Sequence, residues 1–494
     1  MLFYNSGNTI IPIKYCKGKM LQRIEDIPIP LHPLHSSYRY SAKLQSHLQG
    51  RRLLYDSLPF SEELLHEHYI NGYVHYQQGI KKEKKIFTCN RCGNEDQSLF
   101  ATFDCSRCFK PCTYCRNCVM MGRVSQCTTL VTWSGPIQVF KYTHPLVWNG
   151  SLSEGQQKAS EIVQVSIKSA DQLLVWAVCG SGKTELLFEG INDALSNGKY
   201  ICIATPRTDV VLELAPRLQE VFQSVKMSAL YGGSEYSKEL QPLTIATTHQ
   251  LLRFYKAFDV IIIDEVDAFP FSYDPVLQRA VHSAKKDQSS TIYLTATPDL
   301  KWQQRVKKKE VSSIIIPARY HGYPLPVPRF AWCGNWKKSL HKQRIPPPLQ
   351  KWIQQKLTSQ KQSFLFVPSI ELLHILQPLL KKFHSEIEIV HSEDKERKIK
   401  VEKFRSGVIP IIATTTILER GVTVPNTDVA VLGAENAVFT ESSLVQIAGR
   451  VGRSSSYPTG EIVFFHYGQT NAMVRAQRQI KSMNKLANEG GLLK

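Results

Sequence analysis

The sequence lacks any apolar run that approaches the length of a membrane span. Its longest comparable stretch, Val260 to Ile263, is followed at once by Asp264, whereas a spanning helix needs about 20 consecutive apolar residues. The first residues, Met1 to Asn5, also lack the basic and apolar segments of a secretory signal. We therefore expect a cytoplasmic protein without a transmembrane segment.

Acidic residues are scarce relative to basic ones. The 494-residue chain has 42 Asp and Glu against 61 Lys and Arg, which gives a formal net charge of +19. An excess of this size favours a polyanionic partner, either nucleic acid or an anionic membrane surface. Hydrophobic residues make up 43% and charged residues 21%, which excludes a disordered chain and leaves room for two to four domains.

Cysteine is sparse except in one short segment. Eight of the 12 cysteines lie between Cys89 and Cys127, and clustered cysteines in a reducing compartment indicate metal binding rather than disulfides. Cys-x2-Cys pairs place two thiolates within reach of one Zn²⁺, and four thiolates leave no open position for a catalytic water. We therefore expect a structural zinc module. The scattered cysteines are expected to be small buried hydrophobes: Cys16, Cys179, Cys202 and Cys333.

Two sets of short apolar runs alternate with helical stretches. The first set lies at residues 173–178, 200–205, 243–248, 260–265 and 291–297, and the second at 363–368, 386–391, 408–415, 428–433 and 461–466. Such runs indicate buried parallel strands, and proline-rich segments near residues 323–328 and 346–348 separate the sets. The prediction is an α/β protein with two tandem parallel-sheet lobes, at 131–322 and 323–494. The zinc module at 81–130 precedes them. Residues 1–80 have no predicted role, although 61–80 have a loosely helical pattern.

A phosphate-binding loop is predicted between the first strand and the helix expected from Glu185. Residues 177–184 include Gly180, Ser181, Gly182, Lys183 and Thr184. Glycines let backbone N–H groups close around phosphate oxygens, and the helix N-terminus adds partial positive charge. We expect Lys183 to reach the β- and γ-phosphates of ATP, and Thr184 to hold Mg²⁺. Ala177 departs from the strict glycine pattern at the first position of the motif.

Two further elements complete a predicted ATP-hydrolysing site. Asp264 and Glu265 directly follow an apolar strand; Asp264 would hold Mg²⁺, and Glu265 would orient or deprotonate the attacking water. Arg450 and Arg453 lie three residues apart. On one helical turn they would point the same way and stabilise charge on the transferring phosphoryl group.

These elements, in this order, resemble the superfamily 2 helicases across residues 150–470. The resemblance implies two RecA-like lobes and identifies Gln156 as the residue that reads adenine. It also implies contacts with the nucleic-acid strand at residues 205–207 and 247–250 of the first lobe. A motif at 295–297 would couple hydrolysis to movement, and an element of the second lobe at 414–422 would bridge the nucleotide and the nucleic acid.

Longer stretches, at residues 113–124, 246–271, 414–422 and 446–466, resemble the ComFA family of late competence proteins. This resemblance implies an ATPase stimulated by single-stranded DNA, held at the inner face of the cell membrane by competence proteins of the DNA-uptake channel. It also assigns the zinc ligands as Cys89, Cys92, Cys115 and Cys118. A second, nested site remains open for the other clustered cysteines: Cys105, Cys108, Cys112 and Cys127.

Two alternatives belong to other functional classes. The first is another helicase. A PriA-like replication-restart helicase would carry its zinc module inserted within the motor, whereas here the cysteines precede the phosphate loop. An RNA helicase would require stimulation of its ATPase activity by RNA. The second alternative is a non-enzymatic scaffold, which would have lost part of the ATP-hydrolysing site. The intact Lys183, Glu265 and Arg450 argue against that loss.

Overall fold

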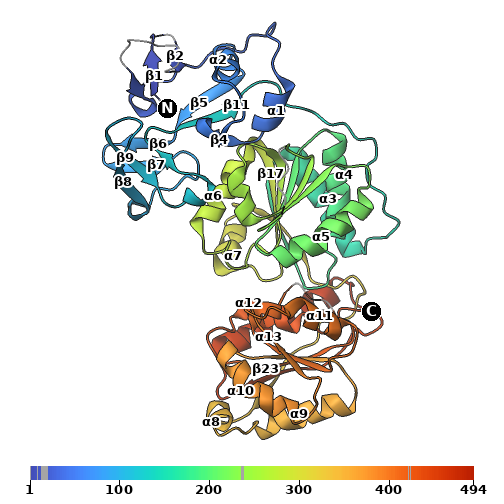
Figure 1. Cartoon of the computed structure of the whole chain (residues 1–494). Coiled ribbons are helices and arrows are strands. Elements are labelled where there is room, and N and C mark those ends of the chain that lie inside the picture. Colours follow the sequence, from blue (N-terminus) through green and yellow to red (C-terminus); the bar gives the residue numbers. More distant parts are fainter. Residues whose placement is uncertain (1, 8, 13–20, 235–238, 421, 423) are drawn as a thin grey trace. The chain divides into compact units, whose positions relative to one another are not determined.

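The computed structural model describes residues 2–7, 9–12, 21–234, 239–420, 422 and 424–494 (Figure 1). Within these residues, no helix has the length and apolar character to cross a membrane. The chain forms two compact units. The first comprises Met1–Trp148, Ser166–Gln172 and Ile191–Ile292, and the second comprises Asn149–Val165, Leu173–Gly190 and Tyr293–Lys494. The domain boundaries expected from the sequence stay predictions.

The N-terminal region contains two small sheets with the strand orders β2-β1-β3 and β4-β11-β5. The rings of Tyr69 and Tyr76 stack at 4.4 Å between centroids in their shared core. The helix expected within 61–80 ends at Ile70, and a strand follows because Gly72 adopts a left-handed φ of +80°. The elements are β1 (Leu2–Asn5), β2 (Ile10–Pro12), β3 (Gln22–Arg23), α1 (Ala42–Leu48), β4 (Arg52–Leu54), α2 (Glu62–Ile70), β5 (Val74–Gln78) and β11 (Thr129–Trp133).

The cysteine-rich segment forms short antiparallel strands between β5 and β11. A hairpin of β6 and β7 precedes a sheet with the order β10-β9-β8. The strands are β6 (Ile80–Glu83), β7 (Ile86–Cys89), β8 (Phe100–Asp104), β9 (Pro111–Cys115) and β10 (Val124–Ser125). The segment is thus an insertion that leaves and re-enters the N-terminal sheet, since β11 pairs with both β4 and β5.

The first lobe contains a sheet with the strand order β14-β15-β13-β16-β17-β12-β18. Its strands are β12 (Gln172–Ala177), β13 (Ile201–Thr205), β14 (Met227–Leu230), β15 (Leu243–Thr247), β16 (Phe258–Ile263), β17 (Lys285–Thr295) and β18 (Ser312–Ile316). Its helices are α3 (Glu154–Ser169), α4 (Phe188–Ser196), α5 (Thr208–Val221), α6 (Pro275–Ala284) and α7 (Leu300–Lys307). The expected strands are present, although β17 begins at Lys285, six residues earlier than its apolar run.

The second lobe contains a sheet with the order β19-β24-β23-β20-β22-β21, and its pairs are parallel. Its strands are β19 (Arg329–Trp332), β20 (Ser363–Phe366), β21 (Glu388–Val390), β22 (Ile411–Thr414), β23 (Asp428–Leu432) and β24 (Ile462–His466). Its helices are α8 (Trp336–His341), α9 (Pro347–Thr358), α10 (Ile370–Lys381), α11 (Arg397–Arg405), α12 (Glu441–Ala448) and α13 (Asn471–Glu489).

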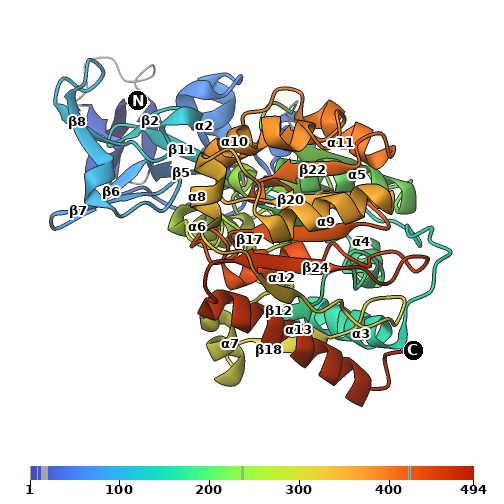
Figure 2. The ribbon, with the colours of Figure 1, turned by 90° about the horizontal axis from the view of Figure 1, so that it is seen from below.

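Helices cover both faces of this second sheet. Residues of α11, α12 and α13 pack on one face, while residues of α8, α9 and α10 pack on the other, the face seen in Figure 2. Strand residues are buried on both sides, which explains the continuous apolar runs in the sequence. The expected α/β architecture of two parallel-sheet lobes after a cysteine-rich module is confirmed.

Candidate nucleotide site and cysteine clusters

The predicted phosphate loop follows β12 directly. Gly180 and Gly182 adopt left-handed φ values of +82° and +75°, which side chains rarely tolerate. The chain then makes one 3₁₀ turn (η6, Glu185–Leu187) before α4, whereas the sequence suggested that the α-helix begins at Glu185. Lys183 and Thr184 are half-buried at this turn. The loop therefore has the strand–loop–helix context that phosphate binding needs.

One buried hydroxyl in the loop shows that it fits a phosphate group. The Ser181 side chain is fully buried, and its Oγ has no hydrogen-bond partner among the described residues. A buried polar atom without a partner is costly, and a phosphate oxygen would accept a hydrogen bond from it. The residues present thus fit the nucleotide that the motif implies.

Gln156 lies against the phosphate loop. It is buried in the first turn of α3, and its Nε2 donates to the carbonyl oxygen of Gly182 at 3.4 Å. A Cβ at Gly182 would come within 2.1 Å of that nitrogen, so only glycine fits there. The role of Gln156 in reading adenine stays a prediction.

The predicted acidic residues directly follow the end of β16, in the first unit. The backbone N–H of Asp264 donates to Ala204 at 2.8 Å, which extends the parallel pairing of β13 and β16 by one residue. Asp264 Oδ1 then accepts from the N–H of Glu265 at 2.9 Å, and Glu265 has a φ of +56°. This bend ends the strand and leaves both residues half-buried. Their joint action with Lys183 stays a prediction.

The arginine-rich element, residues 449–453, is not helical. The expectation that both arginines share a helical turn is wrong. Helix α12 ends at Ala448, and Gly452 adopts a left-handed φ of +71°, which ends helical geometry. Arg450 is buried, donates to the carbonyl of Val422 and lies 5.4 Å from the ring centroid of Phe364. Arg453 donates from Nε to the Gly449 carbonyl at 3.1 Å. The catalytic roles of the two arginines stay predictions.

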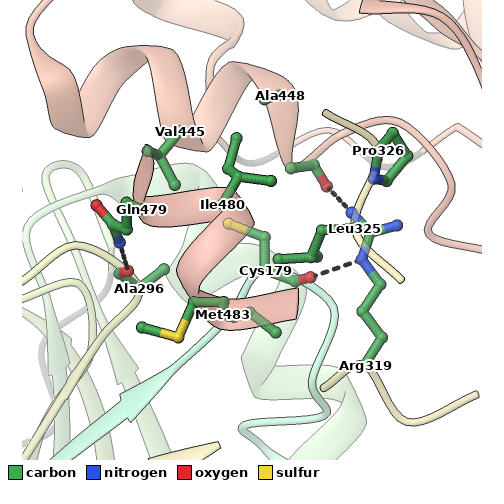
Figure 3. Close-up of a pocket in the computed structure, with 12 residues that line it drawn as sticks. Cys179, Ala296, Arg319, Leu325, Pro326, Val445, Ala448, Gln479, Ile480 and Met483 are labelled. Atoms are coloured by element: carbon green, nitrogen blue, oxygen red, sulfur yellow. Dashed lines mark hydrogen bonds between the residues drawn. The ribbon is translucent and has the colours of Figure 1, made fainter. Parts of the chain in front are cut away.

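A residue that the sequence did not identify connects this element to the phosphate loop within the second unit. Arg319 follows β18 and is 2% exposed. Its Nε donates to the carbonyl of Cys179 in the phosphate loop at 3.2 Å (Figure 3). Its other nitrogens donate to carbonyls of the arginine-rich element, at Gly449 (3.2 Å), Val451 (2.7 Å) and Gly452. Burial, together with the charge of Arg453, lowers the pKa of Arg319 to about 10.

Three more contacts join segments of the second unit. The Cys179 thiol donates to Gln446 Oε1 at 3.0 Å, so this cysteine has a polar partner that we did not expect. The hydroxyls of Thr297 and Ser442 lie 2.8 Å apart, and Gln479 donates to the Ala296 carbonyl at 2.9 Å. The expected coupling motif at 295–297 therefore contacts α12 and α13. In the bridging element at 414–422, residue 421 lies outside the described residues.

These contacts border a small, mainly apolar cavity of about 20 Å³. Figure 3 shows its walls: the phosphate loop, Arg319 and the following proline-rich segment, and the facing sides of α12 and α13. A space of this size holds little more than one water molecule. The phosphate loop and the arginine-rich element are thus closely packed around Arg319, and packed groups of this kind transmit strain.

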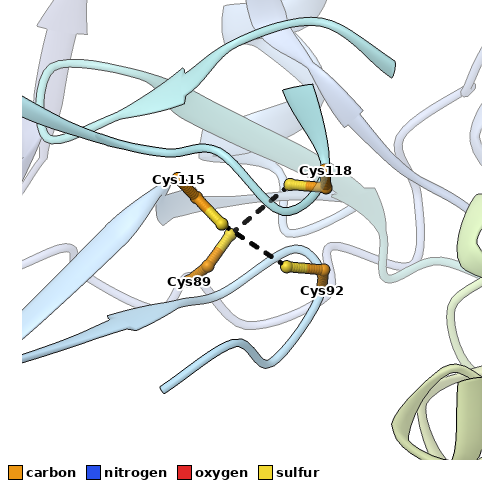
Figure 4. A group of neighbouring side chains, drawn as sticks. All are labelled: Cys89, Cys92, Cys115 and Cys118. Carbon is orange, nitrogen blue, oxygen red and sulfur yellow. Dashed lines mark hydrogen bonds between the residues drawn. The ribbon is translucent and has the colours of Figure 1, made fainter. Parts of the chain in front are cut away.

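The first cysteine cluster brings together the four cysteines that the family resemblance assigned to zinc. Their sulfurs all lie within 4.8 Å of one another, at Cys89, Cys92, Cys115 and Cys118 (Figure 4). The Sγ–Sγ distances are 3.8 Å for Cys89–Cys118 and 3.7 Å for Cys92–Cys115. A tetrahedral zinc with Zn–S bonds of about 2.3 Å requires sulfurs about 3.8 Å apart. The four buried thiols therefore fit Zn²⁺.

The four remaining clustered cysteines form a separate group of the same kind. Their sulfurs also lie within 4.8 Å of one another, and the Cys105–Cys127 distance is 3.5 Å. Hydrogen bonding from Cys112 lowers the pKa of the Cys127 thiol to about 4. The group Cys105, Cys108, Cys112 and Cys127 thus offers a second complete set of metal ligands.

Comparison with known proteins places the motor within a wide class. A DEAD/DEAH box helicase model matches residues 153–306, and a helicase conserved C-terminal domain model matches 348–455. The chain is 25% identical over 330 residues to the ATP-dependent DNA helicase RecG of Streptococcus pneumoniae, covering 61% of this chain and 47% of that protein. Together with the two parallel-sheet lobes, the helicase models define a superfamily 2 helicase-type ATPase, and such an enzyme uses ATP with Mg²⁺.

Closer matches define the family. A model described as the competence protein ComFA N-terminal domain covers residues 36–132. The chain is 49% identical to competence protein ComFA of Bacillus subtilis, over 92% of this chain and 98% of that protein. It is 38% identical to ComFA of Streptococcus pneumoniae, over 83% of this chain and 93% of that protein. The chain belongs to the ComFA family and is a helicase-type ATPase of competence.

Proposed function

We propose that this ATPase is a motor that translocates on single-stranded DNA and draws transforming DNA across the cell membrane during competence. The observation that carries the proposal is the set of contacts from Arg319, which joins the phosphate loop to the arginine-rich element. Nucleotide-dependent movement of one element would be transmitted to the other. Family membership and the net charge of +19 support DNA as the polymer.

In this proposal the described residues share the work of hydrolysis. Lys183 and the backbone of Gly180, Ser181 and Gly182 bind the ATP phosphates, and Thr184 with Asp264 holds Mg²⁺, which neutralises developing phosphate charge. Glu265 orients the attacking water, and Gln156 reads adenine. Arg450 and Arg453 stabilise the transferring phosphoryl group.

The cysteine clusters would each hold one Zn²⁺ as a structural ion. Four thiolates close the coordination shell of each site, so the metal stabilises the module and takes no part in hydrolysis. The basis is the matched geometry of the two sets of sulfurs. The protein would act at the inner face of the membrane, held there by competence proteins of the uptake channel, as the family suggests.

The decisive experiment measures ATP hydrolysis by the purified protein alone and with single-stranded DNA, duplex DNA or single-stranded RNA. Strong stimulation by single-stranded DNA supports the proposal. Stimulation by RNA alone, or by none of the polymers, would overturn it. Lys183→Ala should abolish turnover while keeping the fold. Lys158→Ala is the matched control, because Lys158 is exposed on α3 and, among the residues that the structure describes, pairs only with the exposed Glu154 at 2.6 Å.

A further inference from the structure

A second cavity lies between the first cysteine cluster and the first lobe, and both of its walls belong to the first unit. Its volume is about 340 Å³. One wall is the knuckle at residues 88–93, and the other combines Tyr255 and Lys256 with the C-terminal end of α6 and the start of β17. Apart from two cysteines of the zinc cluster, none of the predicted site residues lines this cavity.

The lining is strongly basic. Five side chains carry positive charge, and Asp287 is the one acidic residue among the lining residues that the structure describes. Asp287 is already paired with Lys256 at 2.7 Å. Within the described part of the chain, Arg279 and Lys285 have no ion-pair partner, and the buried Nε of Arg279 has no hydrogen-bond partner. The lining cations are Arg52, Arg91, Lys256, Arg279 and Lys285.

The walls are held in place by contacts that do not depend on a ligand. Arg52 donates to the carbonyl of Asn90 in the knuckle, and its guanidinium lies 3.4 Å from the ring centroid of Tyr255. Arg91 donates to carbonyls of the facing knuckle at Cys118 and Met121. Because Arg52 and Arg91 fix the walls, Arg279 and Lys285 are left to bind an anion.

The chemistry of the lining selects the ligand. Because Asp287 is already paired with Lys256, the unpaired cations favour phosphates, which Arg can bind through two hydrogen bonds and Lys as a point charge. Arg52 already covers one face of the Tyr255 ring, so that face offers no platform for base stacking. The cavity lies at the lower end of the range of about 300–1,000 Å³ typical of small-ligand sites. It therefore admits a short piece of one strand but not a duplex.

The cavity is remote from the predicted hydrolytic carboxylates. Tyr255 and Lys256 precede the first residue of β16, whereas Asp264 follows its last. A strand of six residues is about 20 Å long. A ligand here would thus be bound at the opposite edge of the sheet from Asp264.

We propose that this basic cavity, lined by Arg279 and Lys285, is an anchoring site for the sugar-phosphate backbone of single-stranded DNA. The inference rests on the proposed function, since it gives the motor a second, sequence-tolerant grip on the same strand. The zinc knuckle forms one wall of the site, so metal binding in the first cluster also shapes a DNA contact.

The test compares the double variant Arg279→Gln/Lys285→Gln with Arg39→Gln/Lys43→Gln. The control loses the same charges from exposed positions of the first unit that do not line the cavity. Binding of a fluorescent oligo-dT is measured by anisotropy at several salt concentrations. Each lost phosphate contact on a single strand reduces the salt slope by about 0.7, so the slope should fall by about 1.4 and affinity by on the order of 10-fold. The control should match the wild type.

Zinc content and ATPase activity without DNA should be unchanged in both variants, which shows that the fold is intact. Wild-type affinity and slope in the cavity variant would overturn the proposal, as would an equal loss in the control. An equal loss of binding to a blunt duplex would overturn the single-strand assignment. Failure of the wild-type protein to bind oligo-dT would instead refute the proposed function, and this inference with it.

Discussion

Arg319 carries a buried charge whose hydrogen bonds, among the described contacts, all go to backbone carbonyls. Carbonyl oxygens satisfy the donors but do not neutralise the charge, and burial accordingly lowers its pKa. The planar fork of arginine can reach acceptors on two segments at once. We therefore regard Arg319 as a positioning residue that aligns the phosphate loop with the arginine-rich element.

Replacing Arg319 tests this alignment. Arg319→Ala should lower kcat by about 10- to 100-fold, because misplacement by about 1 Å is enough to cost that much, and should change KM for ATP less. Arg319→Lys keeps the charge without the fork and should restore little activity. Arg478→Ala is the control, since Arg478 is exposed on α13. Unchanged kcat with a lower melting temperature would show that Arg319 only stabilises the fold.

The sequence predicted those site residues that occur in a local pattern. The glycines and lysine of the phosphate loop, and the carboxylates after an apolar strand, are signalled by their immediate neighbours. Arg319 has no such signal, because its acceptor Val451 lies 132 residues further along the chain. The orientation of Arg450 and Arg453 was mispredicted because the left-handed φ of Gly452, which only the backbone shows, prevents a helix there.

At the scale of elements, the cysteine segment consists of short strands that cannot bury a large core. The eight thiols instead fill its interior in two sets of four. Small modules of this kind usually depend on a structural metal. The stability of the segment should therefore follow its metal content.

Metal analysis of cysteine variants tests this dependence. We expect two Zn²⁺ per chain in the wild type, and one in either Cys89→Ala or Cys127→Ala, because each change leaves only three thiolates in one cluster. Cys202→Ala is the control, since Cys202 is buried in β13 outside both clusters. A content of one zinc in the wild type that Cys127→Ala leaves unchanged would show that the second cluster is a set of free thiols.

The first residue of β23 contributes a pH-sensitive ion network to the second lobe. Asp428 is buried and lies 2.5 Å from Lys356 and 2.8 Å from Lys361, and Lys356 also lies 2.8 Å from Glu461. Burial would raise the pKa of Asp428, but the hydrogen bonds from the two lysines outweigh it and lower that pKa. A carboxyl with a depressed pKa stabilises the fold above its unfolded pKa, which is about 3.9.

This stabilisation should be complete at neutral pH and disappear as the pH falls below about 4. Asp428→Asn leaves the half-buried Lys361 without this partner and Lys356 with Glu461 alone, and should lower the free energy of unfolding by about 3 kcal/mol at pH 7. The difference in the free energy of unfolding between the variant and the wild type should become smaller as the pH approaches 3. Urea unfolding across this pH range measures both effects, and Asp287→Asn, which alters an exposed pair, is the control. A difference in unfolding free energy that does not depend on pH would contradict the stabilising role of ionised Asp428.

The sequence predicted interior elements better than peripheral ones. Buried strands such as β16 and β23 have unbroken apolar runs because helices cover both faces of their sheets. The sequence did not predict β14, β18 and β19, since their partly exposed residues obscure the apolar pattern. The sequence predicted a β17 that begins too late, because the first residues of the strand, from Lys285 to Ser289, are polar.

At the scale of the whole molecule, the net charge of +19 should make the response to DNA depend on salt. Binding to a phosphate backbone releases condensed cations, so the logarithm of affinity falls with the logarithm of salt by about 0.7 per contact on a single strand. Hydrolysis of ATP in the absence of DNA involves no contact with a phosphate backbone. Salt should therefore weaken activation by DNA much more than it slows turnover without DNA.

Titrating single-stranded DNA into the ATPase assay from 50 to 200 mM salt measures both quantities. A slope near −3 in a plot of the logarithm of affinity against the logarithm of salt would indicate about four phosphate contacts. The DNA concentration for half-activation would then rise by about 60-fold over that range. The rate without DNA should change little. A peptide nucleic acid of the same base sequence, which has no backbone charge, is the control and should not activate. Activation by that neutral polymer, or half-activation that does not depend on salt, would mean that bases rather than phosphates are recognised, contrary to a motor that must move along any incoming sequence.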